Sequence, residues 1–145
     1  MDANALARAC ADAMWAEDEA SRGLGMRLVS VAPGRAELTM TVTDRMVNGH
    51  KNCHGGFIFT LADSAFAFAS NTYDQRTVAQ HCAVTFVAPG RLGDELTARA
   101  VEKQRGGRSG IYDITVTRQD GSVIAEFRGH SRTIEGSLLA QSART

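Results

Sequence analysis

The 145-residue chain has few lysines and no excess of charge of either sign. Sixteen acidic residues balance sixteen basic ones, and only Lys51 and Lys103 among the basic residues are lysines. A protein that holds nucleic acid through its phosphates needs a basic face. The charge balance therefore argues against general binding of nucleic acid, and we expect no nucleic-acid partner.

Cysteine is also scarce, and no long apolar run is present. Cys10, Cys53 and Cys82 are odd in number and scattered, so they imply no disulfide framework, which fits a reducing compartment. The first twenty residues carry acids where a signal peptide needs a basic and then an apolar segment. No apolar run approaches the length of a membrane span. We therefore expect a soluble cytoplasmic protein without a membrane partner.

What is present is typical of one globular domain. Hydrophobic residues make up 43% of the chain and charged residues 22%, close to the average for soluble proteins. A length of 145 residues suits one domain, and neither an internal repeat nor a linker interrupts it. We interpret residues 1–145 as a single domain, with an N-terminal helix within residues 1–22 and a frayed tail over 135–145.

Hydrophobic spacing predicts the order of the elements. Residues 3–20 follow the three-four spacing of an amphipathic helix, ended by Gly23 and Gly25. Alternating polarity and turn residues predict six strands, at 26–31, 36–42, 78–87, 95–105, 109–118 and 123–133. The first two strands should form a hairpin, and the last four should follow one another as a meander.

Between the hairpin and the meander lies a run, Phe57 to Ser70, that is apolar on every side. A helix of this kind must be covered all round, so it belongs in the core. The element order predicts an α+β fold in which a curved antiparallel sheet wraps round this long central helix. The sides that the sheet leaves open need the N-terminal helix or a second chain, so we expect at least a dimer.

Asp63 lies in the middle of this apolar run. An ionised carboxylate in apolar surroundings is costly unless a polar group meets it, and Asp is a poor residue for a helix interior. Two interpretations are open. Asp63 either pairs with a structural group at the rim of the helix, or it lines a cleft as a base or nucleophile. Its place in the run favours the second.

His54-Gly55-Gly56 comes directly before the same run. Glycine lets a ligand approach the backbone, and free amides at a helix N-terminus suit an oxyanion, although a tight turn is the simpler interpretation. Gly55 and Asp63 lie roughly 12 Å apart along a helix. A carbonyl under attack must lie about 3 Å from both its oxyanion donor and its nucleophile. One chain therefore cannot supply both, and the site would lie at a dimer interface.

The string NGHKNCHGGFIFTLADSAFAFA, with TFVAPGRLGDEL and DGSVIAEFRGHSR after it, closely resembles the PaaI type of hotdog-fold thioesterase, a family associated with phenylacetate catabolism. The resemblance runs from about Leu24 to Arg132. It implies a hotdog fold and hydrolysis of an acyl-CoA thioester, either an aryl-acetyl-CoA such as phenylacetyl- or hydroxyphenylacetyl-CoA or a short acyl-CoA. It also implies a homodimer, usually paired into a tetramer, and no cofactor beyond the CoA of the substrate.

The resemblance further implies a role for each site residue. Asp63 would be the nucleophile or general base, and the amide of Gly55 would polarise the thioester carbonyl. Asn48 would orient the water or the substrate, and His54 would shape the oxyanion side. Taken alone, Asn48 belongs to an ordinary Asn-Gly turn dipeptide and His54 could be a structural histidine. Some relatives also place a serine near the start of the following strand, where this chain has Ala79 and Gln80.

The phosphates of CoA need cations and backbone donors. The candidates are Gly56 and the arginines that flank the glycine turns, Arg91, Arg105 and Arg108. Solvated turn arginines are an equally good interpretation of each of the three. We expect the acyl pocket to be lined by apolar residues such as Phe57, Leu61 and Phe66.

A metal site is not expected, because the cluster of His50, Cys53, His54 and His81 matches no zinc spacing and has no acidic ligand beside it. Two other functions stay open. One is a hotdog enoyl-CoA hydratase or dehydratase, although the usual His-Phe-Pro-Gly string of those enzymes is absent. The other is a non-catalytic module that binds acyl-CoA.

Overall fold

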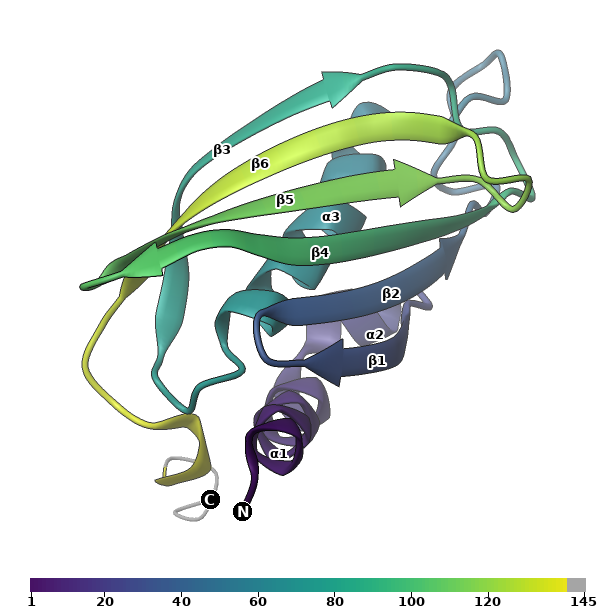
Figure 1. The fold of residues 1–145 in the computed structure, drawn as a ribbon. Helices are drawn as coiled ribbons and strands as arrows, with labels where there is room; N and C mark the ends of the chain where they lie inside the picture. Colours follow the sequence, from purple (N-terminus) through teal and green to yellow (C-terminus); the bar gives the residue numbers. More distant parts are fainter. Residues whose placement is uncertain (141–145) are drawn as a thin grey trace.

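The computed structural model describes residues 1–140 of the chain. Two N-terminal helices, a hairpin, a central helix and four further strands follow one another (Figure 1). Their bounds are α1 Ala3–Glu17, α2 Glu19–Gly23, β1 Arg27–Ala32, β2 Arg35–Thr41, α3 Gly55–Ser70, β3 Thr77–Phe86, β4 Glu95–Gly106, β5 Ser109–Thr117 and β6 Val123–Thr133. Each strand and the central helix lie where the hydrophobic pattern predicts them.

All six strands form one antiparallel sheet in the order β1-β2-β4-β5-β6-β3. The sheet curves round α3, which lies against its inner face (Figure 1). The α+β hotdog architecture predicted from the sequence is therefore confirmed. Although α3 is the most apolar segment, no helix within residues 1–140 has the length and hydropathy needed to cross a membrane.

The predicted four-strand meander is wrong for one strand. β4, β5 and β6 are neighbours in chain order, but β3 lies at the edge of the sheet beside β6. Both sides of β4 are already occupied, by β2 and by β5, so β3 has no place next to it. Residues 87–94 therefore connect an edge strand to the middle of the sheet.

The single N-terminal helix predicted over residues 3–20 is broken at Asp18. The carboxylate of Asp18 accepts hydrogen bonds from the amide and the hydroxyl of Ser21, and thereby caps α2. The Ser21 hydroxyl also lies 2.8 Å from the hydroxyl of Ser64 on α3. This buried contact ties the N-terminal helices to the central helix.

Residues 135–140, at the start of the tail that the sequence predicts to fray, contact the segment that follows α3. The Ser137 hydroxyl and the Leu139 amide each donate to the Asp74 carboxylate, at 2.9 Å. The Arg76 amide donates to the Gly136 carbonyl at 3.1 Å. These bonds join residues 135–140 to the rest of the fold, while residues 141–145 of the predicted tail lie outside the described part of the chain.

Close contact between α3 and the sheet depends on Gly129 of β6. A Cβ atom at Gly129 would lie 2.6 Å from the ring of Phe66 on α3. Phe66 cannot easily move aside, because its ring is buried against Tyr112 and Phe127. The bare backbone at Gly129 therefore sets how closely the helix approaches the sheet.

We predict that Gly129→Ala destabilises the fold by about 1–3 kcal/mol, because the added methyl group overpacks the core against Phe66. Urea unfolding at neutral pH measures the change. Gly23→Ala is the matched control, since a Cβ at Gly23 meets no atom within 4 Å. An unfolding midpoint for Gly129→Ala equal to that of the wild type would contradict the tight contact.

Candidate functional site

The start of α3 presents unused backbone donors. His54 is the N-cap residue, but its side chain accepts no helix amide, and its own amide donates to the Met46 carbonyl at 2.8 Å. Within residues 1–140, the amides of Gly55 and Gly56 donate to no protein group. Free amides and the helix dipole make this end of the helix attractive to negative charge. It can hold an oxyanion.

A groove of about 450 Å³ opens beside these amides. Its lining is Cys53, Gly55, Ile58, Phe86, Val87, Ala88 and Pro89. The ring of Phe86 lies over Gly55, since a Cβ at Gly55 would come within 2.8 Å of it. Phe86 is nevertheless 50% exposed. A mostly apolar cleft therefore adjoins the free donors of the helix.

Asp63 lies about two turns further along α3 and is half-buried. Its carboxylate makes no hydrogen bond or ion pair within the described residues. Burial, reinforced by the negative charge of Asp18, raises the pKa of Asp63. The first interpretation, in which Asp63 pairs with a structural group, therefore has no partner group in this part of the chain. The surroundings of Asp63 fit a reactive carboxylate.

Cys82 is the residue of β3 that shares this environment. Burial raises the pKa of the Cys82 thiol, and the negative charge of Asp63 raises it further. Cys82 packs against the core, whereas Ala79 and Gln80 of the same strand are exposed. Asp63 therefore lies close to the edge strand of the sheet.

Gly55 and Asp63 stand on one uninterrupted helix, Gly55–Ser70. Their spacing of eight residues corresponds to roughly 12 Å along the helix axis, as the sequence predicts. The two groups cannot both touch one carbonyl of a substrate in a single chain.

The outer edge of β3 is open within the described residues. Within residues 1–140, β6 is the only strand that pairs with β3, and the ten residues of β3, TVAQHCAVTF, include no Asp, Glu, Lys or Arg. A long edge strand without charged side chains is a template for pairing with another chain.

Asn48 organises the loop that leads to the helix. Its side-chain oxygen accepts from the amides of His50, at 3.0 Å, and Asn52, at 3.2 Å. The turn suggested by the Asn-Gly dipeptide is therefore real. The carboxamide nitrogen of Asn48 makes no hydrogen bond within residues 1–140, so the turn does not depend on it.

The three candidate arginines do not gather in one chain. Arg91 donates to the side chain of Asn52 at 3.4 Å, close to the start of α3. The guanidinium of Arg105 lies over the Tyr73 ring, 3.8 Å from its centroid, at the other end of β4. That end is roughly 33 Å away along the strand. Arg108, in the turn after β4, shares the far end. Of the three, Arg91 is the one that contacts the segment leading to Gly55.

The residues predicted to line an acyl pocket, Phe57, Leu61 and Phe66, do not line this groove. Leu61 and Phe66 are no more than 1% exposed, because they face the sheet and fill the core. Phe57 is partly buried against the same core. The groove is lined instead by Ile58 and Phe86.

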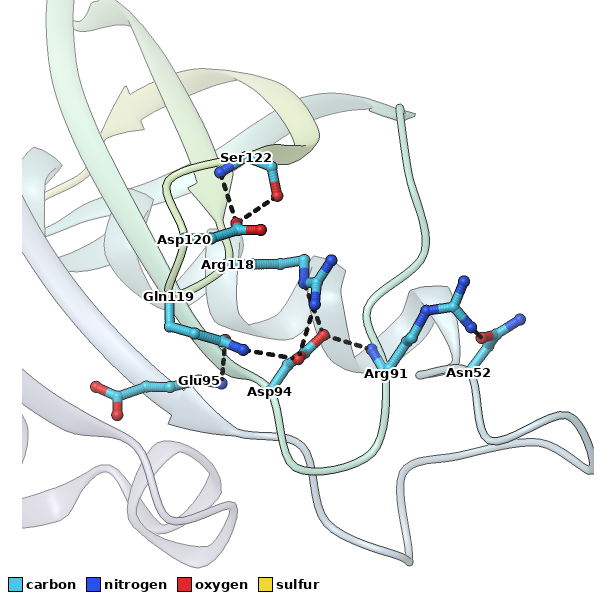
Figure 2. Close-up of polar contacts among 8 residues, drawn as sticks. All are labelled: Asn52, Arg91, Asp94, Glu95, Arg118, Gln119, Asp120 and Ser122. Carbon is cyan, nitrogen blue, oxygen red and sulfur yellow. Dashed lines mark hydrogen bonds and ion pairs between the residues drawn. The ribbon is translucent and has the colours of Figure 1, made fainter.

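Asp94 is a buried carboxylate that the sequence did not predict as part of the site. It holds the turn next to the groove in place. It accepts hydrogen bonds from the Arg91 amide at 2.8 Å and the Gln119 side chain at 3.0 Å (Figure 2). It also pairs with Arg118 at 3.0 Å. Its only signal in the sequence is an acid directly after the glycine of a turn, Gly93.

The turn that Asp94 holds is joined to the segment just before Gly55. The Cys53 amide donates to the Gly90 carbonyl at 2.6 Å, and the Leu92 amide donates to the Lys51 carbonyl at 3.1 Å. These backbone bonds fix the start of α3 against the groove wall. Within residues 1–140, no group of three His, Cys, Asp or Glu side chains lies close enough to hold a metal.

The chain is similar in sequence to proteins of a known family. Residues 50–125, which include His54, Gly55 and Asp63, match the Thioesterase superfamily. The chain is 42% identical over 132 residues to the acyl-coenzyme A thioesterase PaaI of Escherichia coli (strain K12), covering 91% of this chain and 94% of that protein.

Solved structures are similar as well. The E. coli PaaI protein from the phenylacetic acid degradation operon superposes with a TM-score of 0.92 at 42% identity, covering 94% of this chain and 99% of that one. The smu.793 protein of Streptococcus mutans bound to acetyl CoA has a TM-score of 0.74 at 26% identity, covering 77% and 90% of the two chains.

We predict that Asp94→Asn lowers the free energy of unfolding by about 2 kcal/mol at pH 7, because Arg118 loses its buried partner. Burial disfavours the charged form of Asp94, but hydrogen bonds from Gln119, the Arg91 amide and Arg118 outweigh it and lower its pKa. The carboxylate thus stabilises the fold at neutral pH, and this stability is lost as pH falls through the lowered pKa.

Urea unfolding at pH 7 and at about pH 3 checks both points, since the difference between variant and wild type should shrink below about pH 4. Asp113→Asn is the matched control, because Asp113 pairs with Arg128 on the exposed face of the sheet. Asp113→Asn should lower the free energy of unfolding much less than Asp94→Asn does. Equal losses in the two variants would show that burial of Asp94 is unimportant.

Proposed function

The chain belongs to the thioesterase superfamily, and we propose that it hydrolyses acyl-CoA thioesters at a site shared between two copies of the chain. One observation carries this proposal: a half-buried carboxylate and a helix-terminal amide, both without a partner within residues 1–140, stand roughly 12 Å apart on one rigid helix. The acyl-CoA substrate is supported by the name of the 42% identical E. coli relative and by the acetyl CoA bound to the S. mutans protein.

In the proposed reaction the carbonyl of the thioester accepts a hydrogen bond from the Gly55 amide of one chain. Asp63 of the other chain, in its ionised form, takes a proton from an attacking water. Alternatively Asp63 attacks first, and water then hydrolyses the mixed anhydride. The negative charge of the tetrahedral intermediate collects on the oxygen that faces the helix N-terminus. In the first route its collapse expels the CoA thiolate, which takes the proton from Asp63, and leaves the free acid; in the second route collapse leaves the anhydride, and the water that hydrolyses it supplies the proton for the thiolate.

The neighbouring residues have supporting roles in this proposal. The unused carboxamide nitrogen of Asn48 would orient the water or the substrate, and His54 would shape the oxyanion side from its exposed position before Gly55. The amide of Gly56 and the guanidinium of Arg91 would help to hold the CoA portion. Aryl-acetyl and short acyl groups are the proposed substrates.

The second copy is proposed to dock at the open edge of β3. Antiparallel pairing of two such edges satisfies the unpaired backbone groups and brings the partner towards Asp63. A tetramer of two such dimers rests on the family resemblance. Coenzyme A enters only as part of the substrate, and no other cofactor is proposed.

We predict that Asp63→Asn lowers kcat/KM for acyl-CoA at least about 100-fold while the fold is retained, because the amide can neither accept a proton nor attack. Thiol release is measured over a panel from acetyl-CoA to phenylacetyl-CoA and its ring-hydroxylated forms. Since burial raises the pKa of Asp63, wild-type activity should rise with pH through a value above the ordinary carboxyl pKa of about 3.9.

Hydrolysis by folded Asp63→Asn as fast as by wild type would rule out the assigned role. Single-turnover hydrolysis in ¹⁸O-water separates the two routes, since label in the Asp63 carboxylate indicates the anhydride. Loss of the conjugated absorbance of an enoyl-CoA without thiol release would instead indicate a hydratase. Binding of CoA esters without either reaction would indicate a binding module.

We predict that Gly55→Ala lowers kcat/KM roughly 10- to 100-fold, because the new methyl group pushes on the Phe86 ring and shifts the oxyanion donor. Gly56→Ala should lose less, since a Cβ there meets no atom within 4 Å. Steady-state thiol release measures both variants. Equal losses of kcat/KM in the two variants would mean that the contact with Phe86 does not affect the position of the Gly55 amide.

Mixed dimers of Asp63→Asn and Gly55→Ala chains test whether the site is shared. Each heterodimer has one site in which both groups are intact, and half of the dimers in an equal mixture are heterodimers. Co-expressed chains should therefore recover about a quarter of wild-type activity. No recovery beyond the two separate variants would place both groups of a site in the same chain.

A further inference from the structure

The chain turns at Asp18, where α1 ends and α2 begins. Asp18 is the N-cap residue of α2, and its backbone is not helical, with φ and ψ of −85° and 82°. Its carboxylate accepts hydrogen bonds from the Ser21 amide at 2.9 Å and from the Ser21 hydroxyl at 2.7 Å. Both oxygens of the carboxylate are therefore held by one residue of α2.

Ser21 in turn joins this carboxylate to the central helix. Its hydroxyl lies 2.8 Å from the hydroxyl of Ser64 on α3. The two serines are 1% and 9% exposed, and a buried hydroxyl is costly without a partner. Ser64 directly follows Asp63 in the chain. The serine bridge therefore holds the Asp18 carboxylate beside the turn of α3 that carries Asp63.

Few titratable groups face Asp63 from the elements packed around it. Within residues 1–140 they are Asp18, from the start of α2, and Cys82, from β3. Burial raises the pKa of the Cys82 thiol, so the thiol is neutral at pH 7. In the dimer proposed above, His54 of the second chain would also approach Asp63. Asp18 is thus the negative charge that the described part of the chain places next to the candidate base.

Resting on the function proposed above, we propose that Asp18 is a positioning residue for the hydrolysis: held by Ser21 and Ser64, its carboxylate acts on Asp63 and not on the substrate. Burial raises the pKa of Asp63, and the negative charge of Asp18 raises it further. A carboxylate with a higher pKa is a stronger base and a better nucleophile. Asp18 therefore makes the ionised form of Asp63 more reactive at neutral pH and less abundant in acid.

The test follows kcat/KM for phenylacetyl-CoA in wild type and Asp18→Asn from about pH 4 to about pH 8, through the loss of thioester absorbance. Asn keeps an N-cap acceptor and removes the charge, so the fold should be retained. We expect the acid limb of the profile to move to lower pH, because Asp63 loses a repelling neighbour. On the neutral plateau kcat/KM should fall about two- to fivefold, because Asp63 becomes a weaker base.

Opposite changes at the two ends of the profile separate this role from a merely structural one. A residue that only supported the fold would lower activity at every pH without moving the acid limb. His54 is the same in both proteins, so the difference between the profiles isolates Asp18.

Glu19→Gln is the matched control. Glu19 is the next residue, and it pairs with Arg22 at 3.1 Å on the exposed side of α2. This variant removes the same charge without disturbing the serine bridge, so its pH profile should equal that of wild type. Ser21→Ala keeps the charge of Asp18 but removes the bridge to Ser64. Its acid limb should move partway to that of Asp18→Asn, because the carboxylate can turn towards water, where its charge is screened.

An unmoved acid limb in Asp18→Asn, with or without a loss of activity, would overturn the role of Asp18. A shift of the same size in Glu19→Gln would also overturn it, since the effect would then come from net charge alone.

A titration that needs no turnover separates these failures from failure of the hydrolytic function. The carboxyl carbon of Asp63 is followed by NMR against pH in ¹³C-labelled protein, and its signal is identified by its absence from the Asp63→Asn spectrum. If wild type releases no thiol, the function fails, yet a lower pKa of Asp63 in Asp18→Asn still supports the action of Asp18 on Asp63. An equal pKa of Asp63 in the two proteins overturns it.

Discussion

The need to cover α3 on all sides governs this structure. A sixteen-residue helix with hardly a polar side chain cannot face water, so the sheet curves round it. Gly129 lets the helix come close to the sheet, and the Ser21–Ser64 contact brings the N-terminal helices onto another side. The helix is thereby fixed in position, and so is everything that it carries at its N-terminus and along its length.

The same burial gives the site its chemistry. Asp63 has a raised pKa because the helix that carries it is covered by apolar neighbours and has Asp18 nearby. The amides of Gly55 and Gly56 have no acceptor in the described part of the chain, because the side chain of the N-cap residue, His54, accepts from neither. Packing that stabilises the fold thus leaves one carboxylate easier to protonate and one helix end ready for negative charge.

Local patterns predicted most of the fold, because alternation and three-four spacing depend only on near neighbours. The place of β3 could not be predicted, because its alternation would suit either side of the last three strands. Asp63 and Gly55 stood out through their residue types within an apolar run. Phe86 and Asp94 did not, since their roles depend on contacts with Gly55 and Arg118 that sequence spacing does not show. Arg91 and Arg105 look alike in sequence, yet the length of β4 separates them.

In the proposed dimer, two chains contribute different groups to each site, because α3 is rigid. Gly55 and the Phe86 groove belong to the same chain, because the ring rests directly over that glycine. Asp63 of that chain is too far along the helix to reach the carbonyl held there. In that arrangement the chain that would bind the carbonyl differs from the chain that would supply the carboxylate. A shift of the two chains at the β3 edge would then change catalysis without changing either half of the site, so the strand pairing itself sets the catalytic geometry.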